Sequence, residues 1–559
     1  MPVRTRPLPW LLLALLSLGA GLGLRDPSPP DEPRFVLAAR HMVESGNWLL
    51  PRRGSELYAH KPPLFMWAQA AGFRLSGSWR IGFLLPSLAA AMLTLILVYD
   101  LGRRLWNRRI GLLAMLALLS TLQFGLQAKR AQIDMLLVAM TTLALWALLL
   151  HFLRGPKPGL LGLGGFAAGL GTVTKGVGFL PLLLILPVAW GLRDRPGPRR
   201  PWRAAGLLAG AFLAGTAVWL LPLGWTAVGG SDPALRQYLH EILFRQTAIR
   251  YADAWHHLQP AWYYLQVIAT MWLPGALLLP WLLPAWRRRW RRGDARLIAL
   301  LGWSLLVLLF FSASPGKREV YIFPALPALC LAAAPMLPGL LRRRGVQRVL
   351  CGWLLLLATA LLAGAGGGLV EARWAQRLVE QRGLLEDEMR TLVAWVAALG
   401  AGALGSALWG LRGRAGAATL ACSLLLFAGY GLGIAPALDA SSSARRLMID
   451  VRARIGAEAE LGLVGWREQH LLQARGAVAE FGFEAPLSLQ WQAGLAWLRE
   501  APERRWLFVL DRELPDCVER PRTERVGRSN RRDWLLVPGP AAAGCTVADD
   551  ARAQASAPK

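Results

Sequence analysis

Apolar residues along the chain form thirteen segments that are separated by polar stretches. Most approach about 20 residues, the length of helix that spans the hydrocarbon core of a bilayer. The first, fifth, sixth and ninth are shorter. The pattern predicts an α-helical polytopic membrane protein with about 13 transmembrane helices. The segments are 9–24, 81–99, 110–126, 134–153, 159–174, 176–192, 204–222, 262–286, 297–313, 320–341, 349–370, 392–411 and 416–436.

Basic clusters precede the first segment and follow every second one. They contain 25 cations and two acids, Asp194 and Asp294, and so account for most of the net charge of +28. Loops rich in arginine and lysine face the cytoplasm. The pattern therefore predicts a cytoplasmic N-terminus and, after an odd number of spans, an external C-terminus. We expect no nucleic-acid partner, because no polar basic domain studded with aromatic residues is present.

The first segment has a second interpretation. Residues 1–9 are basic and the apolar run is short, as in a cleavable signal peptide. Both interpretations leave residues 25–80 outside the membrane, so the expected position of the chemistry does not depend on the choice.

Three parts are predicted. Residues 1–436 form the membrane domain, with interfacial helices in the external loops 25–80 and 223–261. Residues 437–545 alternate between helical and strand patterns, which predicts a small external α/β domain. Residues 546–559 are polar and alanine-rich and are expected to be disordered. In the α/β domain we expect helices at 442–458, 467–475 and 487–499, and strands at 460–466, 476–483, 505–511 and 533–538.

The five cysteines divide into two groups. Cys330, Cys351 and Cys422 lie in apolar segments and are expected to fill space. Cys517 and Cys545 both lie in the external domain, where an oxidising compartment permits disulfides, so they are a candidate pair. No closely spaced cysteine pair suggests a structural zinc ribbon.

An acidic pair, Asp31 and Glu32, stands at the end of a proline-rich stretch and at the start of an amphipathic helical pattern. One interpretation is that the acids complement the dipole of that helix. The other is that they activate or orient a nucleophile at the level of the lipid headgroups. The local sequence leaves both open.

Several external stretches hold cations that depart from the rule organising the other loops. Ionisable groups at the membrane boundary of a helix bundle are candidates for function. If they converge, they form an anion site, and a lipid phosphate is the obvious anion. A single lysine beside an apolar run can also be one that extends its amine to the interface. The cations are Lys61, Lys129 with Arg130, Lys175, and Lys317 with Arg318, and Asp134 follows Arg130 closely.

The second long external loop contains His256 and His257, followed by Trp262, Tyr263 and Tyr264. Aromatic residues at a helix start are typical of the interfacial belt. The histidines could join His60 as metal ligands, although adjacent histidines point in different directions.

Taken in order, these motifs resemble the lipid A aminoarabinose transferase group. That group belongs to the protein O-mannosyltransferase superfamily, which are membrane glycosyltransferases of the GT-C type. The resemblance covers roughly residues 10–340. The motifs are the acid pair with Arg34, Lys61-Pro62, Arg130 with Asp134, Thr174-Lys175-Gly176, a histidine before Trp262-Tyr263-Tyr264, and Ser312 through Lys317-Arg318, Tyr321, Pro324 and Pro327.

The resemblance implies a bacterial inner-membrane enzyme that transfers a sugar, with inversion, from a polyprenyl (undecaprenyl) phosphate to a lipid or glycan acceptor such as lipid A. Asp31 matches the essential aspartate of the first loop, Lys61 the lysine that contacts the donor phosphate, and Asp134 a second important acid. The expected catalytic residues are Asp31, Glu32 and Asp134; the donor-phosphate ligands are Lys61, Arg130, Lys175, Lys317 and Arg318; the substrate-binding residues are Arg34, Tyr58, Tyr264 and Tyr321.

No cofactor is expected to be required. Some relatives bind zinc near the residue before the phosphate-binding lysine, commonly an acid, where this chain has His60. The candidate zinc ligands are therefore His60, His256 and His257.

Two rival functions remain. One is an enzyme similar to the protein O-mannosyltransferases. The other is a lipid or sugar transporter or flippase, which thirteen spans with buried charge would also suit. Transporters commonly show repeated halves with broken helices around a midplane site. This sequence shows no such repeat, and its distinctive residues lie at the external ends of the segments.

Overall fold

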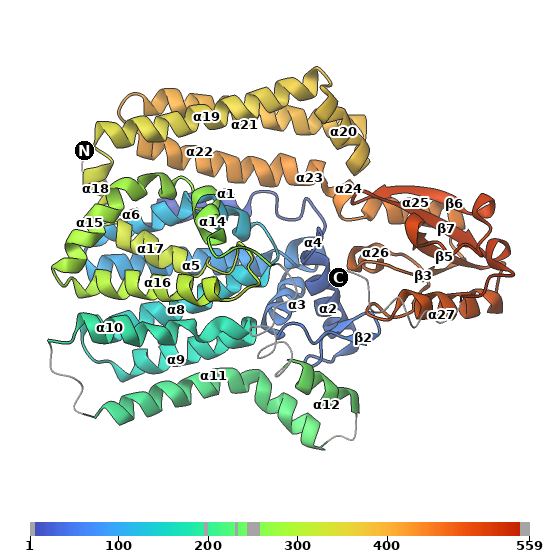
Figure 1. The fold of residues 1–559 in the computed structure, drawn as a ribbon, viewed down its shortest axis with the longest axis horizontal. Coiled ribbons are helices and arrows are strands. Elements are labelled where there is room, and N and C mark those ends of the chain that lie inside the picture. Colours follow the sequence, from blue (N-terminus) through green and yellow to red (C-terminus); the bar gives the residue numbers. More distant parts are fainter. Residues whose placement is uncertain (1–5, 195–199, 230–232, 243–257, 548–559) are drawn as a thin grey trace.

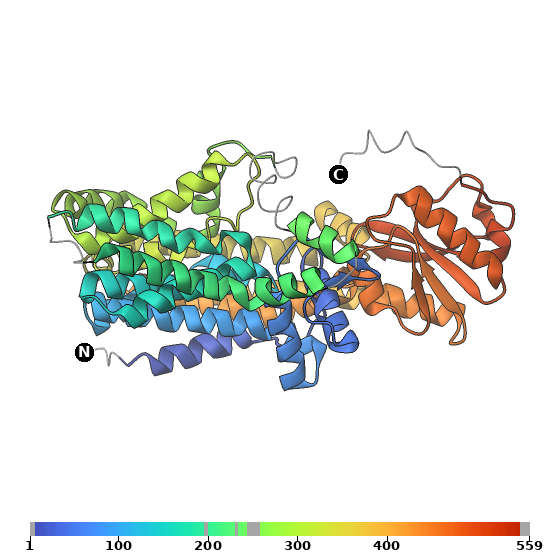
Figure 2. The same ribbon diagram turned by 90° about the horizontal axis from the view of Figure 1, so that it is seen from below.

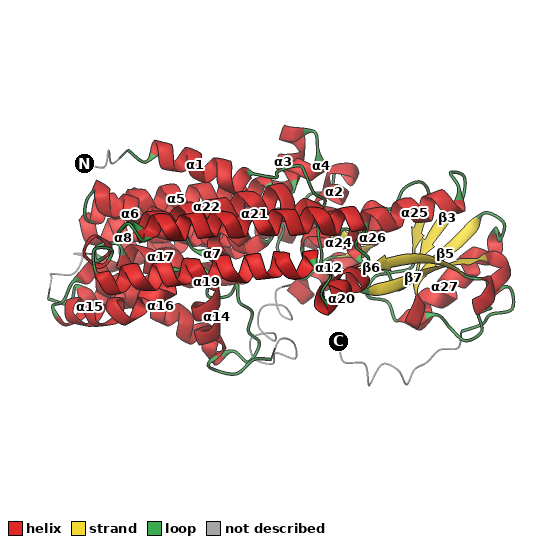
Figure 3. Ribbon diagram, turned by 90° about the horizontal axis from the view of Figure 1, so that it is seen from above, coloured by secondary structure: helices red, strands yellow, loops and turns green. Residues whose placement is uncertain are grey.

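The computed structural model describes residues 6–194, 200–229, 233–242 and 258–547. Figure 1 shows long helices side by side in a bundle, with the C-terminal part of the chain at one end. Figure 2 shows the same arrangement from below, with α1 (Leu8–Gly19) beginning at the opposite end of the bundle. Figure 3 shows that the larger sheet lies in the C-terminal part. The predicted helical membrane region and external α/β region are thus both recognisable.

Within the described residues, seven helices are long and apolar enough to cross a membrane, or up to nine if each of two bent pairs is one span. The bent pairs are α6 (Arg108–Leu119) with α7 (Leu122–Ala128), and α14 (Tyr263–Met271) with η3 (Gly275–Leu278) and α15 (Leu279–Arg291). The seven are α4 (Trp79–Gly82) with α5 (Leu85–Leu105), α8 (Ile133–Arg154), α11 (Pro201–Gly229), α16 (Ala295–Ala313), α19 (Arg344–Leu369), α21 (Glu386–Gly410), and α22 (Ala415–Gly429) with η4 (Tyr430–Ile434) and α23 (Ala435–Ala437).

The other predicted segments are helical but shorter or broken. Pro181 lies inside η1 (Gly176–Leu184), and Pro338 lies in the first turn of α18 (Leu337–Leu340). Each of the thirteen apolar segments therefore corresponds to helix, whereas the number that crosses the membrane stays a prediction. The shorter elements are α1, α9 (Pro158–Thr174), η1 (Gly176–Leu184) with α10 (Ile185–Gly191), and α17 (Ala325–Ala333) with α18 (Leu337–Leu340).

Close packing between α9 and α11 depends on small residues. A Cβ atom on Gly169 would lie 2.3 Å from the carbonyl oxygen of Phe212 and 2.9 Å from the Cα of Gly215. Only glycine permits this approach, which is typical of helix contacts in membranes.

The first loop that was predicted to be external folds into α2 (Glu32–Ser45), a small hairpin of β1 (Arg52–Arg53) and β2 (Glu56–Leu57), and α3 (Leu64–Ser76). The apolar face of α2, including Phe35 and Met42, is buried. Phe35 packs edge to face on Phe65 of α3. Protein therefore covers this face of α2, whereas we expected the helix to lie in the membrane interface.

The second long loop was predicted over 223–261. The helix α11 extends into it, and α12 (Pro233–His240) follows. His256 and His257 lie outside the described residues.

The C-terminal region contains a five-stranded sheet in the order β4-β3-β5-β7-β6. Strand β3 is parallel to β4 and β5, whereas β7 is antiparallel to β5 and β6. One apolar cluster includes residues of α25 and α26, and a second includes residues of α27. The elements are α24 (Asp439–Ser442), α25 (Arg445–Ile455), β3 (Glu460–Leu463), α26 (Glu468–Gln473), β4 (Val478–Glu480), α27 (Leu487–Glu500), β5 (Arg505–Leu510), η5 (Asp511–Glu513), η6 (Arg520–Arg522), β6 (Glu524–Ser529), β7 (Arg532–Pro538) and η7 (Gly539–Ala542).

The predicted helices and strands of this region all have counterparts, but β6 was missed. Its sequence, Glu-Arg-Val-Gly-Arg-Ser, contains little apolar material and a register irregularity near Gly527. A polar strand at the edge of a sheet lacks the alternation on which the prediction relied.

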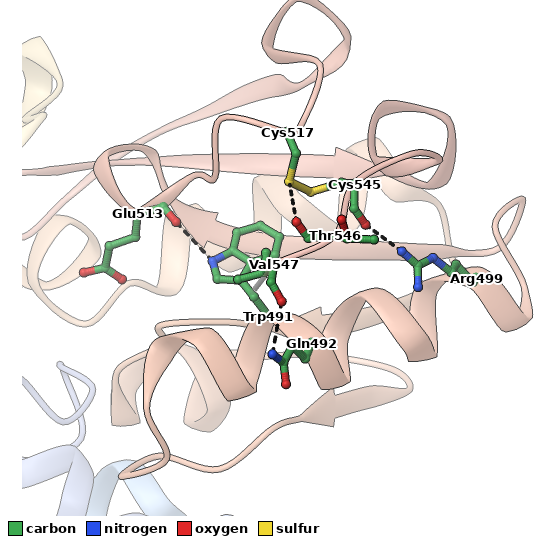
Figure 4. The surroundings of a disulfide bond; sticks show 8 residues. All are labelled: Trp491, Gln492, Arg499, Glu513, Cys517, Cys545, Thr546 and Val547. Carbon is green, nitrogen blue, oxygen red and sulfur yellow. Dashed lines mark hydrogen bonds between the residues drawn. A yellow bond between two sulfur atoms is a disulfide. The ribbon is translucent and has the colours of Figure 1, made fainter. Parts of the chain in front are cut away.

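The predicted disulfide between Cys517 and Cys545 is confirmed (Figure 4). Arg499 of α27 donates to the carbonyl oxygen of Cys545 at 2.6 Å, and Trp491 donates to that of Glu513 at 3.1 Å. These bonds hold the disulfide-linked segments on α27. The other cysteines, Cys330, Cys351 and Cys422, are free and buried, as expected.

The α/β domain also contacts α20 (Arg373–Arg382), which connects α19 to α21. Arg528 of β6 donates to the carbonyl oxygen of Glu380 at 3.0 Å. The α/β domain also contacts α2 and the β1–β2 hairpin, which lie between the bundle and the domain (Figure 1).

Candidate active site

Asp31 lies at the N-cap position of α2, but its carboxylate makes no capping hydrogen bond. One oxygen, Oδ2, accepts from Gln132 Nε2 at 3.0 Å and from Arg318 Nη2 at 3.1 Å. The other, Oδ1, lies 3.9 Å from Arg34 Nη1. The side chain is 15% exposed. Its partners therefore come from distant segments, which favours a role in the site over a role confined to the helix start.

The environment of Asp31 stabilises its anionic form. Burial, the largest influence, raises the pKa of Asp31, but the positive charges of Arg318 and Arg34, with a smaller effect of Lys61, outweigh burial and lower the pKa below its ordinary value. Asp31 is therefore a carboxylate at neutral pH.

Glu32 is bound in a different way. Arg25 makes two hydrogen bonds to it, at 2.5 and 2.7 Å, and the backbone amides of Ser28 and Ala131 donate at 2.8 and 2.9 Å. Both carboxylate oxygens are thus occupied. This geometry favours a positioning role for Glu32 over the predicted catalytic role, because the network ties the start of α2 to the segment that carries Gln132.

Asp134 and Lys175 form an ion pair at 2.6 Å, between the first turn of α8 and the residue that follows α9. The Lys175 ammonium also lies 4.6 Å from the centre of the Tyr321 ring. The predicted acid, phosphate ligand and substrate-binding tyrosine are therefore neighbours.

Arg318 connects this group with Asp31. Burial lowers the pKa of Arg318, but the carboxylates of Asp31 and Asp134 raise it above its ordinary value overall. Lys61, just before α3, is near enough to Asp31 to lower the pKa of that acid. The starts of α2, α3 and α8, the end of α9 and the segment before α17 thus meet in one charged cluster.

Three predicted ligands have different surroundings. Lys317 is buried and donates to the carbonyl oxygens of Ser314 at 2.6 Å and Gln259 at 3.1 Å, so it joins its own loop to the segment before α14. Arg130 is exposed. Tyr264 is 3% exposed and belongs to the apolar core of the bundle. The described contacts of these three residues do not place them with Asp31.

Arg34 and Tyr58 lie on the side of the cluster nearest the α/β domain. Arg34 lies near enough to Tyr58 to lower the pKa of its hydroxyl. Burial raises the pKa of Tyr58, and the neighbouring Arg34 and Arg53 only partly offset this effect, so Tyr58 stays protonated. Arg34 also donates through Nε to Glu468 of α26 at 2.8 Å.

His60 lies 3.3 Å from Glu484 through Nε2. Burial lowers the pKa of His60 to about 4 despite that carboxylate, so its ring is neutral near pH 7. Across the described part of the chain, no three His, Cys, Asp or Glu side chains are grouped as metal ligands. His60 and Glu484 are fewer than the ligands that zinc requires. A zinc site stays a prediction.

Two residues of this cluster were missed in the sequence. Gln132 was overlooked although it stands two positions before Asp134, and its buried Oε1 has no hydrogen-bond partner among the described residues. Glu468 lies more than four hundred residues from Arg34, so no local pattern connects them.

Known proteins resemble both the sequence and the fold. Residues 60–219 match the family model described as dolichyl-phosphate-mannose-protein mannosyltransferase. The undecaprenyl phosphate-alpha-4-amino-4-deoxy-L-arabinose arabinosyl transferase of Pseudomonas aeruginosa (strain LESB58) is 34% identical over 417 residues, which cover 71% of this chain and 70% of that protein.

Two solved structures share the architecture. The crystal structure of ArnT from Cupriavidus metallidurans bound to undecaprenyl phosphate superposes with a TM-score of 0.73 at 21% identity, covering 96% of this chain and 98% of that one. The oligosaccharyltransferase of Archaeoglobus fulgidus gives a TM-score of 0.52 at 13% identity, covering 91% and 70%. At these identities the likeness concerns the fold.

Proposed function

We propose the function of this site from one premise: the chain belongs to the family of undecaprenyl phosphate-alpha-4-amino-4-deoxy-L-arabinose arabinosyl transferases. It is an integral-membrane glycosyltransferase of the GT-C fold that takes a sugar from an undecaprenyl-phosphate donor and passes it to a lipid acceptor. This membership decides against a transporter or flippase. The site's geometry supports finer statements about the acceptor and the role of each residue.

The observation that carries the proposal is an anionic Asp31 among cations at the external ends of the helices. A sugar phosphate that loses its sugar gains negative charge on the departing oxygen. Fixed cations around that oxygen stabilise the transition state without reorganisation. Lys61 and Arg318 serve this role, since both lie near enough to Asp31, at the centre of the cluster, to lower its pKa.

The bond changes define what Asp31 does. An acceptor oxygen forms a bond to the anomeric carbon, the bond from that carbon to the phosphate oxygen breaks, and its electron pair leaves with undecaprenyl phosphate. Such transfers develop positive charge on the sugar ring. A carboxylate held ionised, as Asp31 is, stabilises this charge and orients the sugar.

The lowered pKa of Asp31 also favours one kind of acceptor. A hydroxyl must lose a proton, and an efficient general base has a pKa near the working pH. Asp31 has a pKa below the ordinary carboxyl value and is a weak base. An acceptor phosphate is already ionised and needs only positioning. The site therefore suits a phosphate of lipid A better than the hydroxyl of a protein serine or threonine.

The test is a transfer assay with the purified full-length protein and undecaprenyl phosphate-linked 4-amino-4-deoxy-L-arabinose. We expect the sugar to pass to lipid A and not to lipid A whose phosphates have been removed. A serine- and threonine-rich peptide should remain unmodified. Transfer to the peptide, or equal transfer to both forms of lipid A, would refute the phosphate acceptor.

We also propose that the charged cluster and the α/β domain face the periplasm, with the N-terminus in the cytoplasm. The support is the sorting of basic residues, since α5 and α15 end in arginines in loops predicted to be cytoplasmic. Reporter fusions after Arg109, Arg203 and Arg296 should read cytoplasmic, whereas a fusion at Ala457 should read periplasmic. A cytoplasmic signal at Ala457 would reverse the orientation.

A further inference from the structure

Glu468 lies in the first turn of α26, in the α/β domain, and is only 4% exposed. Its Oε1 accepts from Arg34 Nε at 2.8 Å and lies 3.4 Å from Arg53 Nη1. Both arginines belong to the first external loop. A buried carboxylate is costly unless it is paired, so these two contacts account for its burial.

Arg34 has a second contact on the opposite side. It stands one helical turn after Asp31, with Nη1 at 3.9 Å from Oδ1 of that acid. A guanidinium is planar, so a hydrogen bond at Nε fixes the direction of the two terminal nitrogens. The Glu468 contact therefore determines how Arg34 presents its charge to Asp31.

We propose that Glu468 is a positioning residue of the transfer reaction, acting through Arg34, so that the α/β domain completes the active site of the membrane domain. The inference rests on the proposed function and deepens it. Glu468 itself is not placed against the substrate. Its carboxylate binds Nε of Arg34 and leaves Nη1 of the same guanidinium near Asp31.

The docking of the domain does not depend on Glu468 alone. Leu37 of α2 belongs to the apolar cluster that contains Leu447, Trp466 and Phe508 of the domain. Leu472 of α26 packs against the cluster that joins α2 and α3. Loss of the Glu468 charge should therefore leave the interface in place and change the orientation of Arg34.

The same interface supplies a matched control. Glu480 of β4 accepts from the backbone amide of Ser55 at 2.6 Å, in the turn of the β1–β2 hairpin. It joins the domain to the first loop as Glu468 does, yet it accepts hydrogen bonds from the backbone amides of Ser55 and Gly482 and not from Arg34. A Glu480→Gln variant removes an interface charge without touching the proposed relay.

The test measures kcat and the donor KM of the folded, full-length protein. Glu468→Gln should lower kcat on the order of 10- to 100-fold, the scale of a misdirected catalytic group, while KM changes little. Glu480→Gln should stay within about twofold of the wild type by the same reasoning. Glu468→Asp keeps the buried charge but is shorter, and should give an intermediate kcat.

A double-mutant cycle decides whether Glu468 acts through Arg34. Once Arg34→Gln has removed the guanidinium, adding Glu468→Gln should lower kcat no further. The inference would be overturned if the fold-losses in kcat of the two single variants multiplied in the double variant. It would also be overturned if Glu468→Gln were as active as Glu480→Gln. If Glu468→Gln does not fold, unchanged kcat in Glu468→Asp overturns it equally. An inactive wild type would instead mean that the proposed function is wrong.

Discussion

The Nζ atom of Lys175 lies 2.6 Å from Oδ1 of Asp134, although the two residues are 41 positions apart. Lys175 stands where α9 ends and η1 begins, and Asp134 lies in the first turn of α8. The pair fixes the two helix ends beside Arg318 and so closes the charged cluster on the side of the bundle.

Breaking this pair should destabilise the protein, because both side chains are largely buried. Lys175→Met or Asp134→Asn alone should cost about 3 kcal/mol, since removing one partner leaves an unpaired buried charge. The double variant should recover part of that loss. Thermal unfolding of the purified variants measures it. Additive losses would show that the two residues act independently.

Asp31→Asn should reduce transfer by roughly 10² to 10³ fold, the usual cost of removing one group that stabilises charge in the transition state. Donor binding should persist, since the amide keeps the shape and removes only the charge. Asp194→Asn, in an exposed basic loop, is the control and should be fully active. Near-normal transfer by Asp31→Asn would show that Asp31 has only a structural role at the start of α2.

Lys61→Ala should weaken both donor affinity and turnover, because the proposed partner of the ammonium is a phosphate that is anionic before reaction and gains charge during it. Lys61→Arg should recover activity only partly, since a planar fork does not replace a compact point charge. Lys157→Ala, an exposed lysine at the start of α9, is the control. Wild-type behaviour of both Lys61 variants would remove Lys61 from the site.

The α/β domain should lose stability on acidification because of His470. Burial, with Arg467 and Arg532 nearby, lowers the pKa of His470 to about 3. Between that value and the unfolded pKa of about 6.5, the unfolded chain binds more protons, so stability falls as pH falls. The contribution reaches about 1.4 kcal/mol per pH unit.

His470→Asn tests this dependence. The residue keeps an acceptor for the backbone amide of Arg467, which His470 Nδ1 now binds at 3.1 Å, and it does not titrate. The fall in Tm between pH 7 and pH 5 should be smaller in the variant than in the wild type. Equal falls would mean that other groups govern the acid sensitivity.

The disulfide should stabilise the C-terminal part of the α/β domain. Cys517 and Cys545 are 28 positions apart. Closing such a loop is worth on the order of 3 kcal/mol in the chain-entropy model. Thiol labelling of denatured, unreduced protein should modify three cysteines, and labelling after reduction should modify five. Five labels without reductant would exclude the bond.

The helices were predictable because long apolar segments permit little else in a membrane. The roles of the site residues were less predictable, because residues that are adjacent in sequence can have different surroundings in the fold. Asp31 and Glu32 are adjacent, yet Asp31 faces Arg318 whereas Glu32 is enclosed by Arg25 and two backbone amides. Sequence indicates that both are acids at a helix start, and only tertiary contacts separate their roles.

Two lysines that were predicted to be external also differ in their surroundings. Lys175 and Lys317 both depart from the charge rule of the loops, and both were predicted as phosphate ligands. In the fold, Lys175 pairs with a carboxylate and a tyrosine ring, whereas Lys317 donates to two carbonyl oxygens. The difference depends on which backbone groups the loop presents, which residue types do not reveal.

The contact between Arg34 and Glu468 joins residues that are 434 positions apart. The ribosome therefore makes Asp31, Arg34 and Lys61 long before it makes the partner that directs Arg34. The nascent chain therefore contains Asp31 and the proposed phosphate ligand Lys61 before Glu468 has been made. If Glu468 positions Arg34 as proposed, a chain that stops before α26 keeps these residues but lacks the contact that directs Arg34, and its transfer should be slower.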